Sequence, residues 1–84
     1  MIRDDVRQFI MESFMFGSSP QDLDDSASFL ETGIVDSTGI MELIGFLESE
    51  FQTKIEDREM IPENLDSIDR VVKYLEGKGV ASQP

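Results

Sequence analysis

The sequence predicts an all-α fold, an antiparallel four-helix bundle of three main helices and one short helix. Three segments, residues 2–16, 38–51 and 68–76, place apolar side chains at three- and four-residue steps, which is the spacing of one buried helix face. No segment shows a strand pattern longer than a few residues. The chain has 84 residues, which is enough for one hydrophobic core. We therefore expect a single domain over residues 1–79, followed by a loose tail at residues 80–84.

The first predicted helix covers residues 2–16 and ends in the segment Gly17-Ser18-Ser19-Pro20, because Gly permits a left-handed cap and Pro cannot continue the hydrogen-bond ladder. A long connection then leads to position 36. A connection of this length needs packing of its own to stay ordered. Four apolar residues should tie it to the helices: Phe29, Leu30, Ile34 and Val35.

Within this connection, Asp22, Asp24 and Ser26 have the spacing of a calcium-binding loop. That motif requires Gly at its sixth position and a bidentate Glu at its twelfth. The sequence has Ala27 and Gly33 at these positions. The motif fails twice, and we expect no metal site.

The second main helix, residues 38–51, has the clearest periodicity. Its apolar residues fall within a narrow arc, with Leu47 in the middle and expected to be buried: Ile40, Leu43, Ile44, Leu47 and Phe51. A polar loop follows, in which residues 62–65 can form one helical turn with Pro62 at its first position. Asp66 or Ser67 should cap the last helix. That helix ends at Gly77 and Gly79, and one side of it carries Ile68, Val71, Val72 and Leu75.

The composition restricts the possible partners. Eighteen acidic and seven basic residues give a net charge of −11, which repels nucleic acids and anionic membrane surfaces. The acidity either keeps the protein soluble or speeds its encounter with enzymes that carry a positive patch, and the charge favours neither interpretation. The chain has no Cys and no His, so an enzymatic function is remote. Acidic residues interrupt the apolar start, so we expect no targeting segment and a location in the cytoplasm. We also expect the protein to be a monomer.

The most informative segment is residues 29–44, where Gly33 precedes an Asp36-Ser37 pair and a helix begins at the Ser. This segment resembles the acyl carrier protein family, in which such a pair opens the second helix of a four-helix bundle. Residues 46–51 and 62–68 resemble later parts of the same fold. The resemblance implies a 4'-phosphopantetheine arm, transferred from coenzyme A to Ser37, that holds an acyl or aminoacyl group as a thioester. It also implies three partners: a phosphopantetheinyl transferase, an acyl- or aminoacyl-activating ligase and a downstream transferase or synthase.

Each residue of the implied site also has a simpler explanation. Ser37 or Thr38 could be only a helix N-cap, and Asp36, implied to help the transferase recognise the site, could be only a capping carboxylate. The resemblance assigns Glu42 and Glu48 to contacts with basic residues of partner enzymes, but both could lie on a solvated face. A flexible apolar Met41 beside the arm would suit varied partners, or it could fill the core.

The sequence also departs from the usual pattern of fatty acid carriers. Two residues, Ile34 and Val35, separate Gly33 from Asp36 instead of one, and Thr38 and Gly39 follow Ser37. This spacing resembles D-alanyl carrier proteins and other stand-alone carriers that a separate adenylate-forming ligase loads. Thr38 replaces an apolar partner contact of the family, and Gly39 lowers helix propensity by about 1 kcal/mol relative to Ala.

Two questions stay open at this stage. A long acyl chain would need a cavity inside the bundle, which could be lined by Ile40, Leu43, Leu47, Ile61 and Ile68 or filled instead by the Phe residues of the first helix. The main alternative function is an unmodified acidic adaptor with the same bundle, although that hypothesis gives no reason for an exposed Ser at the helix start.

Overall fold

The computed structural model describes residues 2–15 and 19–79 and confirms an all-α fold. Across these residues it contains five α-helices: α1 (Ile2–Phe14), α2 (Phe29–Thr32), α3 (Ser37–Phe51), α4 (Pro62–Leu65) and α5 (Ile68–Gly77). Two 3-10 turns lie in the connections, at Pro20–Asp22 and Asp57–Glu59. The predicted stop signal at residues 17–18 and the predicted tail lie outside the described residues.

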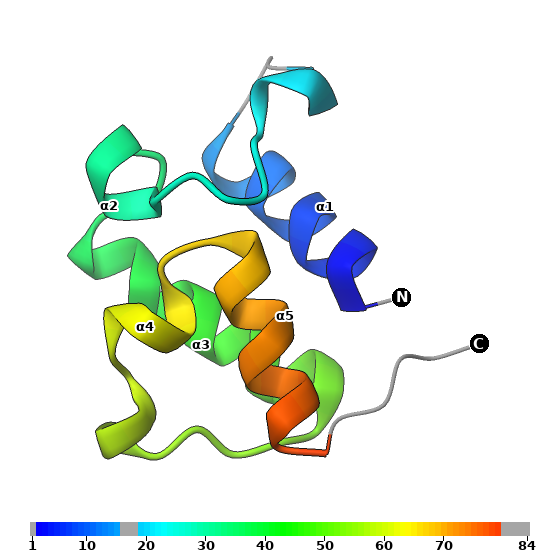
Figure 1. The fold of residues 1–84 in the computed structure, drawn as a ribbon, viewed down its shortest axis with the longest axis vertical. Coiled ribbons are helices and arrows are strands. Elements are labelled where there is room, and N and C mark those ends of the chain that lie inside the picture. The colour runs from blue at the N-terminus through cyan, green and yellow to red at the C-terminus, as the bar shows by residue number, and fades with distance from the viewer. Residues whose placement is uncertain (1, 16–18, 80–84) are drawn as a thin grey trace.

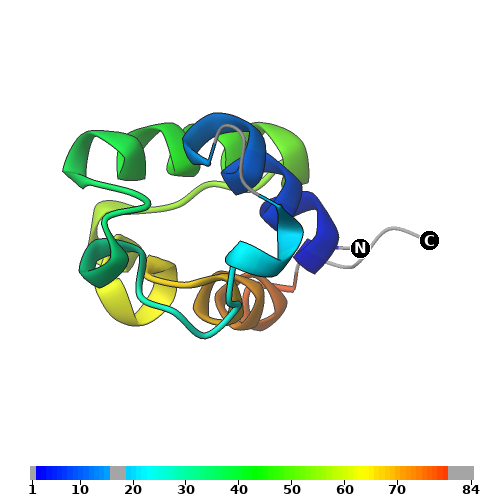
Figure 2. The same ribbon diagram turned by 90° about the horizontal axis from the view of Figure 1, so that it is seen from above.

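The main helices are arranged around one core. α1 and α5 run in opposite directions (Figure 1), and α3 lies on one side of the bundle with α4 and α5 on the other (Figure 2). None of the described helices is long and apolar enough to span a membrane. The three main helices and the short α4 correspond to the predicted elements, with different ends. α1 ends at Phe14 and not at residue 16, since Met15 already lies outside the helix, and α3 begins at Ser37, one residue before the predicted range 38–51.

Helix α2 was not predicted, although its end signals are present in the sequence. The side chain of Ser28 accepts a hydrogen bond from the N–H of Glu31, and Gly33 adopts a left-handed conformation with φ of 77° after the last turn. α5 is capped similarly, because the side chain of Ser67 accepts a hydrogen bond from the N–H of Arg70. Of the two cap candidates for α5, Ser67 is therefore the correct one.

The core confirms the predicted apolar faces. Leu47 is fully buried, as are Leu43 and the apolar face of α5. The connections contribute Leu23, Phe29, Val35 and Ile55, so the two long loops are pinned to the bundle by buried side chains. The prediction that Leu30 anchors the first connection to the helices is wrong, because its side chain is 47% exposed.

A cluster of charges joins three elements at one side of the bundle. Arg3 of α1 contacts Asp25 of the first connection at 2.7 Å and Asp69 of α5 at 2.6 Å. Arg7 pairs with the same Asp25 and donates a hydrogen bond to the Leu23 carbonyl at 3.0 Å. Partly exposed ion pairs contribute modestly to stability, and this network links the first connection to α1 and α5.

Four Phe residues form an aromatic cluster between α1 and α3 that packs against the core. Phe9 stacks on Phe46 with ring centroids 4.2 Å apart, while Phe14 meets Phe9 edge-on at 5.8 Å and Phe51 meets Phe46 at 6.2 Å. Such pairs add to the stabilisation that burial alone provides. The first-helix rings thus fill the seam with α3, and Phe16 lies outside the described residues.

Candidate functional site

Ser37 is the first residue of α3 and is exposed. The cap of this helix is Asp36, whose Oδ1 accepts a hydrogen bond from the N–H of Gly39 at 2.7 Å. The interpretation of Ser37 or Thr38 as the N-cap is therefore wrong, and the capping interpretation of Asp36 is confirmed. Because Asp36 performs the capping, the Ser37 hydroxyl is not required to hold the helix start.

The first turn of α3 packs closely against α1, and Gly39 makes this possible. A Cβ at position 39 would lie 2.8 Å from Cε1 of Phe14, which is closer than unbonded carbons approach, and 3.1 Å from Cγ1 of Val35, which is tighter than ordinary van der Waals contact. The sequence analysis treated Gly39 only as a loss of helix propensity. The structure shows that the missing Cβ of Gly39 also leaves room for the Phe14 and Val35 side chains beside the first turn of α3.

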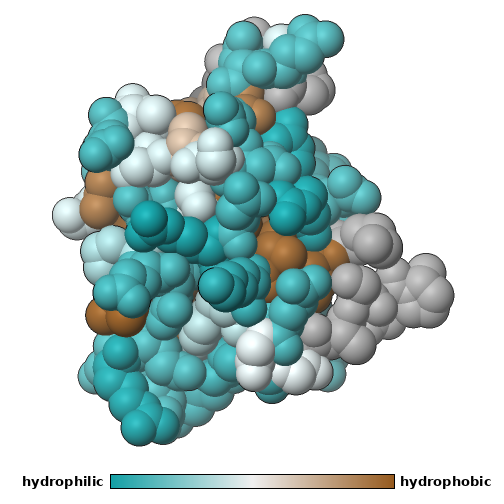
Figure 3. Space-filling view, in the orientation of Figure 1, coloured by the Kyte–Doolittle hydropathy of each residue, from teal (hydrophilic) through white to brown (hydrophobic). Residues whose placement is uncertain are grey.

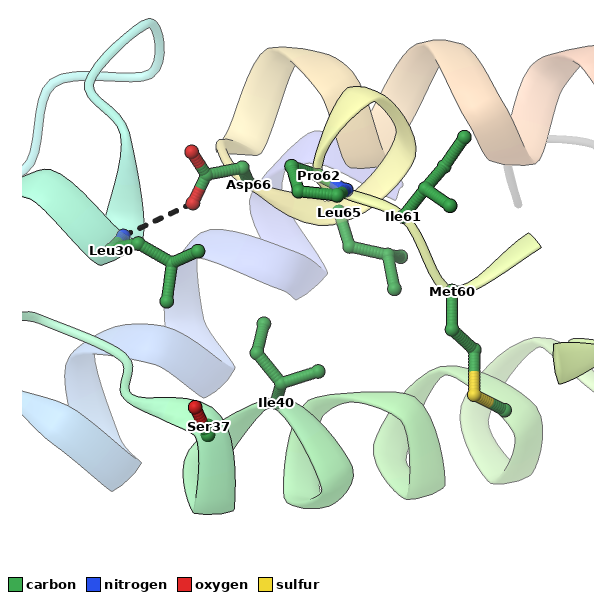
Figure 4. Close-up of a pocket in the computed structure, with 8 residues that line it drawn as sticks. All are labelled: Leu30, Ser37, Ile40, Met60, Ile61, Pro62, Leu65 and Asp66. Carbon is green, nitrogen blue, oxygen red and sulfur yellow. Dashed lines mark hydrogen bonds between the residues drawn. The ribbon is translucent and has the colours of Figure 1, made fainter. Parts of the chain in front are cut away.

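A pocket of about 200 Å³ opens beside Ser37, between α2, α3 and α4. The Ser37 side chain points from α3 toward this space, and Leu30 and Asp66 border it from the other side (Figure 4). Its walls are mostly apolar, and the lining residues are Leu30, Ser37, Ile40, Met60, Ile61, Pro62, Leu65 and Asp66.

The pocket differs from the cavity considered from the sequence. Ile40 and Ile61 line it as expected, but Leu43, Leu47 and Ile68 belong to the closed core. Met60, Leu65 and Asp66 were not anticipated as site residues. They are more than 20 positions from Ser37 in sequence, and no local pattern brings them together with it.

Three large apolar side chains are strongly exposed in the described part of the chain: Leu30 (47%), Met41 (61%) and Ile61 (41%). Leu30 and Ile61 border the Ser37 pocket, and Met41 follows Ser37 by one helical turn. Elsewhere the face seen in Figure 3 is mostly hydrophilic, with small separate hydrophobic areas. Exposed apolar side chains of this size are unusual on the described surface. The interpretation of Met41 as a core residue is wrong.

The remaining predicted site residues differ in solvent exposure and in whether their side chains are held by hydrogen bonds. Thr38 and Glu42 are exposed on α3, and Glu42 lies about 7.5 Å from Ser37 along the helix axis. Glu48 is half-buried, about 16 Å from Ser37 along the axis, and its Oε2 accepts a hydrogen bond from the N–H of Ile55 at 2.9 Å. Glu48 therefore ties the end of α3 to the following loop.

The shifted pKa values of acidic groups lie at loop and turn positions. The pKa of Glu59 is lowered because its carboxylate accepts from the N–H of Glu56 at 3.0 Å and pairs with Lys78, also at 3.0 Å. The pKa of Asp24 is lowered because Asp24 accepts hydrogen bonds from the N–H and the hydroxyl of Ser26. Asp24, once considered as a calcium ligand, thus stabilises a turn.

Comparison with known proteins agrees with this geometry. A family model for the phosphopantetheine attachment site matches residues 6–75. The acyl carrier protein of Chlamydia muridarum is 35% identical over 75 residues, which cover 89% of this chain and 92% of that protein. The acyl carrier protein of Bdellovibrio bacteriovorus is 36% identical over 76 residues, which cover 90% and 92%. The protein of the same name from Wolinella succinogenes is 29% identical over 75 residues, which cover 89% and 93%. The chain therefore belongs to the acyl carrier protein family, whose members carry a covalent 4'-phosphopantetheine group.

Proposed function

We propose that Ser37 bears the phosphopantetheine arm and that the chain carries an acyl or aminoacyl group on it as a thioester. The observation that carries this proposal is the exposed Ser37 hydroxyl, which is spared from capping by Asp36 and directed toward an apolar pocket. Exposure lets both the modifying enzyme and later partners reach this atom. Carriers provide no catalytic group of their own in such a scheme, because the partners perform the chemistry.

The surroundings of Ser37 at the start of α3 are suited to the phosphate of the phosphopantetheine arm. In the modification, the Ser37 Oγ replaces adenosine 3',5'-bisphosphate on the phosphopantetheine phosphorus of coenzyme A and loses its proton, which leaves a phosphodiester anion. The first N–H groups of a helix have no acceptor inside it, and the positive end of the helix dipole favours a nearby anion by about 0.3–1 kcal/mol. The start of α3 is therefore a favourable place for the phosphate.

The pocket beside Ser37 can hold part of the arm or of an apolar acyl group attached to it. Its volume of about 200 Å³ and its Leu, Ile and Met walls fit an apolar chain better than a charged one. We propose that an acyl group of sufficient length enters this space and is partly shielded from water. A small aminoacyl cargo does not require it.

The partners in this proposal are a phosphopantetheinyl transferase, a separate adenylate-forming ligase and a downstream transferase or synthase. Two residues between Gly33 and Asp36 support a dedicated pathway of this kind over fatty acid elongation. Asp36 would serve transferase recognition, and the surface formed by Thr38, Met41 and Glu42, extended by Glu48, would dock these enzymes. Because coenzyme A and ATP supply the arm and the activation, we place the exchange in the cytoplasm.

Intact mass tests this proposal against an unmodified adaptor. After incubation with a transferase and coenzyme A, the wild type should gain the mass of one phosphopantetheine, and Ser37→Ala should stay at its original mass. Ser49→Ala is the matched control, the same substitution at an exposed Ser near the other end of α3, and it should be modified like the wild type. Ser37→Ala should change the free energy of unfolding by less than about 0.5 kcal/mol, because Ser37 is exposed and not the cap.

Two outcomes would contradict it. A mass gain on Ser37→Ala would show that another residue is the attachment point. A wild type that stays at its original mass, with a transferase that modifies other carriers, would favour the adaptor.

A further inference from the structure

We infer that Asp66 is a positioning residue that fixes helix α2, and with it Leu30, as one wall of the Ser37 pocket. The inference rests on the proposed function of that pocket. α2 has four residues, and a helix this short is not stable in isolation. Its place therefore depends on bonds and contacts with the rest of the molecule.

Asp66 provides three of these bonds from 36 to 38 positions away in sequence. Its Oδ1 accepts a hydrogen bond from the N–H of Leu30 at 3.0 Å, and its Oδ2 accepts one from the hydroxyl of Ser28. Its carbonyl oxygen accepts one from the N–H of Phe29 at 2.7 Å. Ser28 in turn caps α2 by accepting from the N–H of Glu31 at 3.1 Å. Asp66 thus satisfies the start of α2 directly and also holds its cap, with a carboxylate acceptor that forms strong hydrogen bonds.

The same bonds determine one side of the pocket. Leu30 and Asp66 both line it, and the hydrogen bond between them spans the rim on the side facing Ser37 (Figure 4). Leu30 is 47% exposed, so packing does little to hold it. By contrast, Leu65 on the α4 side is 2% exposed and belongs to the core. On the α2 side, Phe29 anchors the helix in the core, whereas the position of Leu30 at the pocket depends mainly on the hydrogen bonds to Asp66.

Loss of the Asp66 side chain should loosen this wall without unfolding the protein. Phe29 is fully buried and stays in the core, and the bond from its N–H to the Asp66 carbonyl does not involve the side chain. Asp66→Ala should then free the Leu30 N–H and the Ser28 hydroxyl only. Asp66→Asn keeps one oxygen that can accept from the Leu30 N–H, but an NH2 group replaces the acceptor of the Ser28 hydroxyl and the negative charge that strengthens both bonds is lost.

Amide hydrogen exchange of the unmodified protein tests the position of α2. In Asp66→Ala the Leu30 amide should exchange about tenfold faster or more, since a hydrogen bond to a charged group is lost, while the Leu65 amide of α4 keeps its rate. In Asp66→Asn the exchange rate of the Leu30 amide should lie between that of the wild type and that of Asp66→Ala. The control is Asp69→Ala, which removes an equal charge three residues later, where the carboxylate contacts Arg3 and not α2. In Asp69→Ala the exchange rate of the Leu30 amide should match that of the wild type.

Thioester cleavage tests the consequence for the pocket. Transferase and acetyl- or octanoyl-coenzyme A load each variant, and hydroxylamine then cleaves the thioester. In the wild type and Asp69→Ala, octanoyl should be cleaved several-fold more slowly than acetyl, and in Asp66→Ala the two rates should converge. A uniform loss of stability would not produce a change that depends on chain length.

The possible failures are distinguishable. Leu30 exchange that stays unchanged in Asp66→Ala overturns the inference, and so does an octanoyl-to-acetyl difference that survives in that variant. If the wild type takes no arm at Ser37, the proposed function fails, and the exchange measurement still decides the role of Asp66. If wild-type octanoyl and acetyl are cleaved alike, the shielding role of the pocket is wrong, and the consequence inferred for Asp66 is overturned with it.

Discussion

The first turn of α3 and its middle belong to one continuous helix but contribute differently to the molecule. In the middle, Leu43, Ile44 and Leu47 are buried and fill the core. In the first turn, Ser37 and Thr38 are exposed, and the contacts are the Asp36 cap and the close approach at Gly39. Stability thus resides mainly in the middle of α3. The proposed site lies at the exposed end of the helix, where the Asp36 cap and the close approach at Gly39 are found.

This arrangement lets function and stability vary separately. A substitution at Ser37 should remove the carrier activity and leave the fold intact, whereas a core substitution should weaken the fold and leave the chemistry of Ser37 unchanged. The predictions below test this separation along α3.

The largest expected effect is that of Leu47→Ala. Leu47 is fully buried, so its truncation removes packing and leaves a cavity, which should lower the free energy of unfolding by about 2–5 kcal/mol. That loss is a large part of the roughly 5–15 kcal/mol that a domain usually has. Urea denaturation measures it. Thr38→Ala on the exposed first turn should change stability by less than about 0.5 kcal/mol, and equal losses in the two variants would break the comparison.

The two glycines of α3 provide the second prediction. Gly39→Ala should destabilise by about 1–3 kcal/mol despite the higher helix propensity of Ala, because the new methyl group meets the Phe14 ring at 2.8 Å and the buried Val35 at 3.1 Å. Phe14 packs edge-on against Phe9, so its movement away from the new methyl group would disturb that contact. The matched control is Gly45→Ala, where nothing lies within 4 Å of the added Cβ. That variant should be stabilised by about 0.5–1 kcal/mol.

Thermal denaturation of the two variants decides this point. Opposite signs would show that the first turn is held by a close steric fit. If both variants are stabilised, the surrounding side chains accommodate the methyl group at position 39, and only the higher helix propensity of Ala determines the effect. The start of α3 can then shift without a cost in free energy.

The sequence predicted the parts of the fold that depend on local periodicity. The three main helices and the buried faces of α3 and α5 follow from the spacing of apolar residues, and α4 follows from Pro62 at its first position. α2 was missed because four residues carry no periodic stripe, although Ser28, Glu31 and Gly33 form the signals of a short helix.

The candidate site was predictable only in part. Asp36 and Ser37 stand out in the sequence because they are adjacent to each other and to a helix start. The pocket could not be anticipated, because α2 and α4 bring Leu30, Leu65 and Asp66 to Ser37 only after the chain folds. Leu30 illustrates the difference: its apolar side chain predicted burial, yet it lies at the pocket rim.

The smallest expected effect concerns docking and should appear in rates rather than in stability. Glu42 is exposed within two helical turns of Ser37, beside Met41, on the surface proposed for partner enzymes. Opposite charges across an exposed interface chiefly speed encounter, and salt weakens them as the Debye length falls to about 8 Å at physiological ionic strength. Glu42→Lys should therefore slow modification by a transferase several-fold at low salt and less at high salt.

The matched control is Glu76→Lys, the same charge change at an exposed position near the end of α5, away from the start of α3 (Figure 1). Glu48 is less suitable, because its reversal would also remove the hydrogen bond to Ile55. If docking uses the α3 surface, Glu76→Lys should retain nearly the wild-type rate at both salt concentrations. If the net charge of −11 acts as a whole, the two reversals should slow modification equally, since each changes the total charge by the same amount. An equal loss would show that the first turn of α3 offers partners a reactive hydroxyl but not a dedicated docking surface.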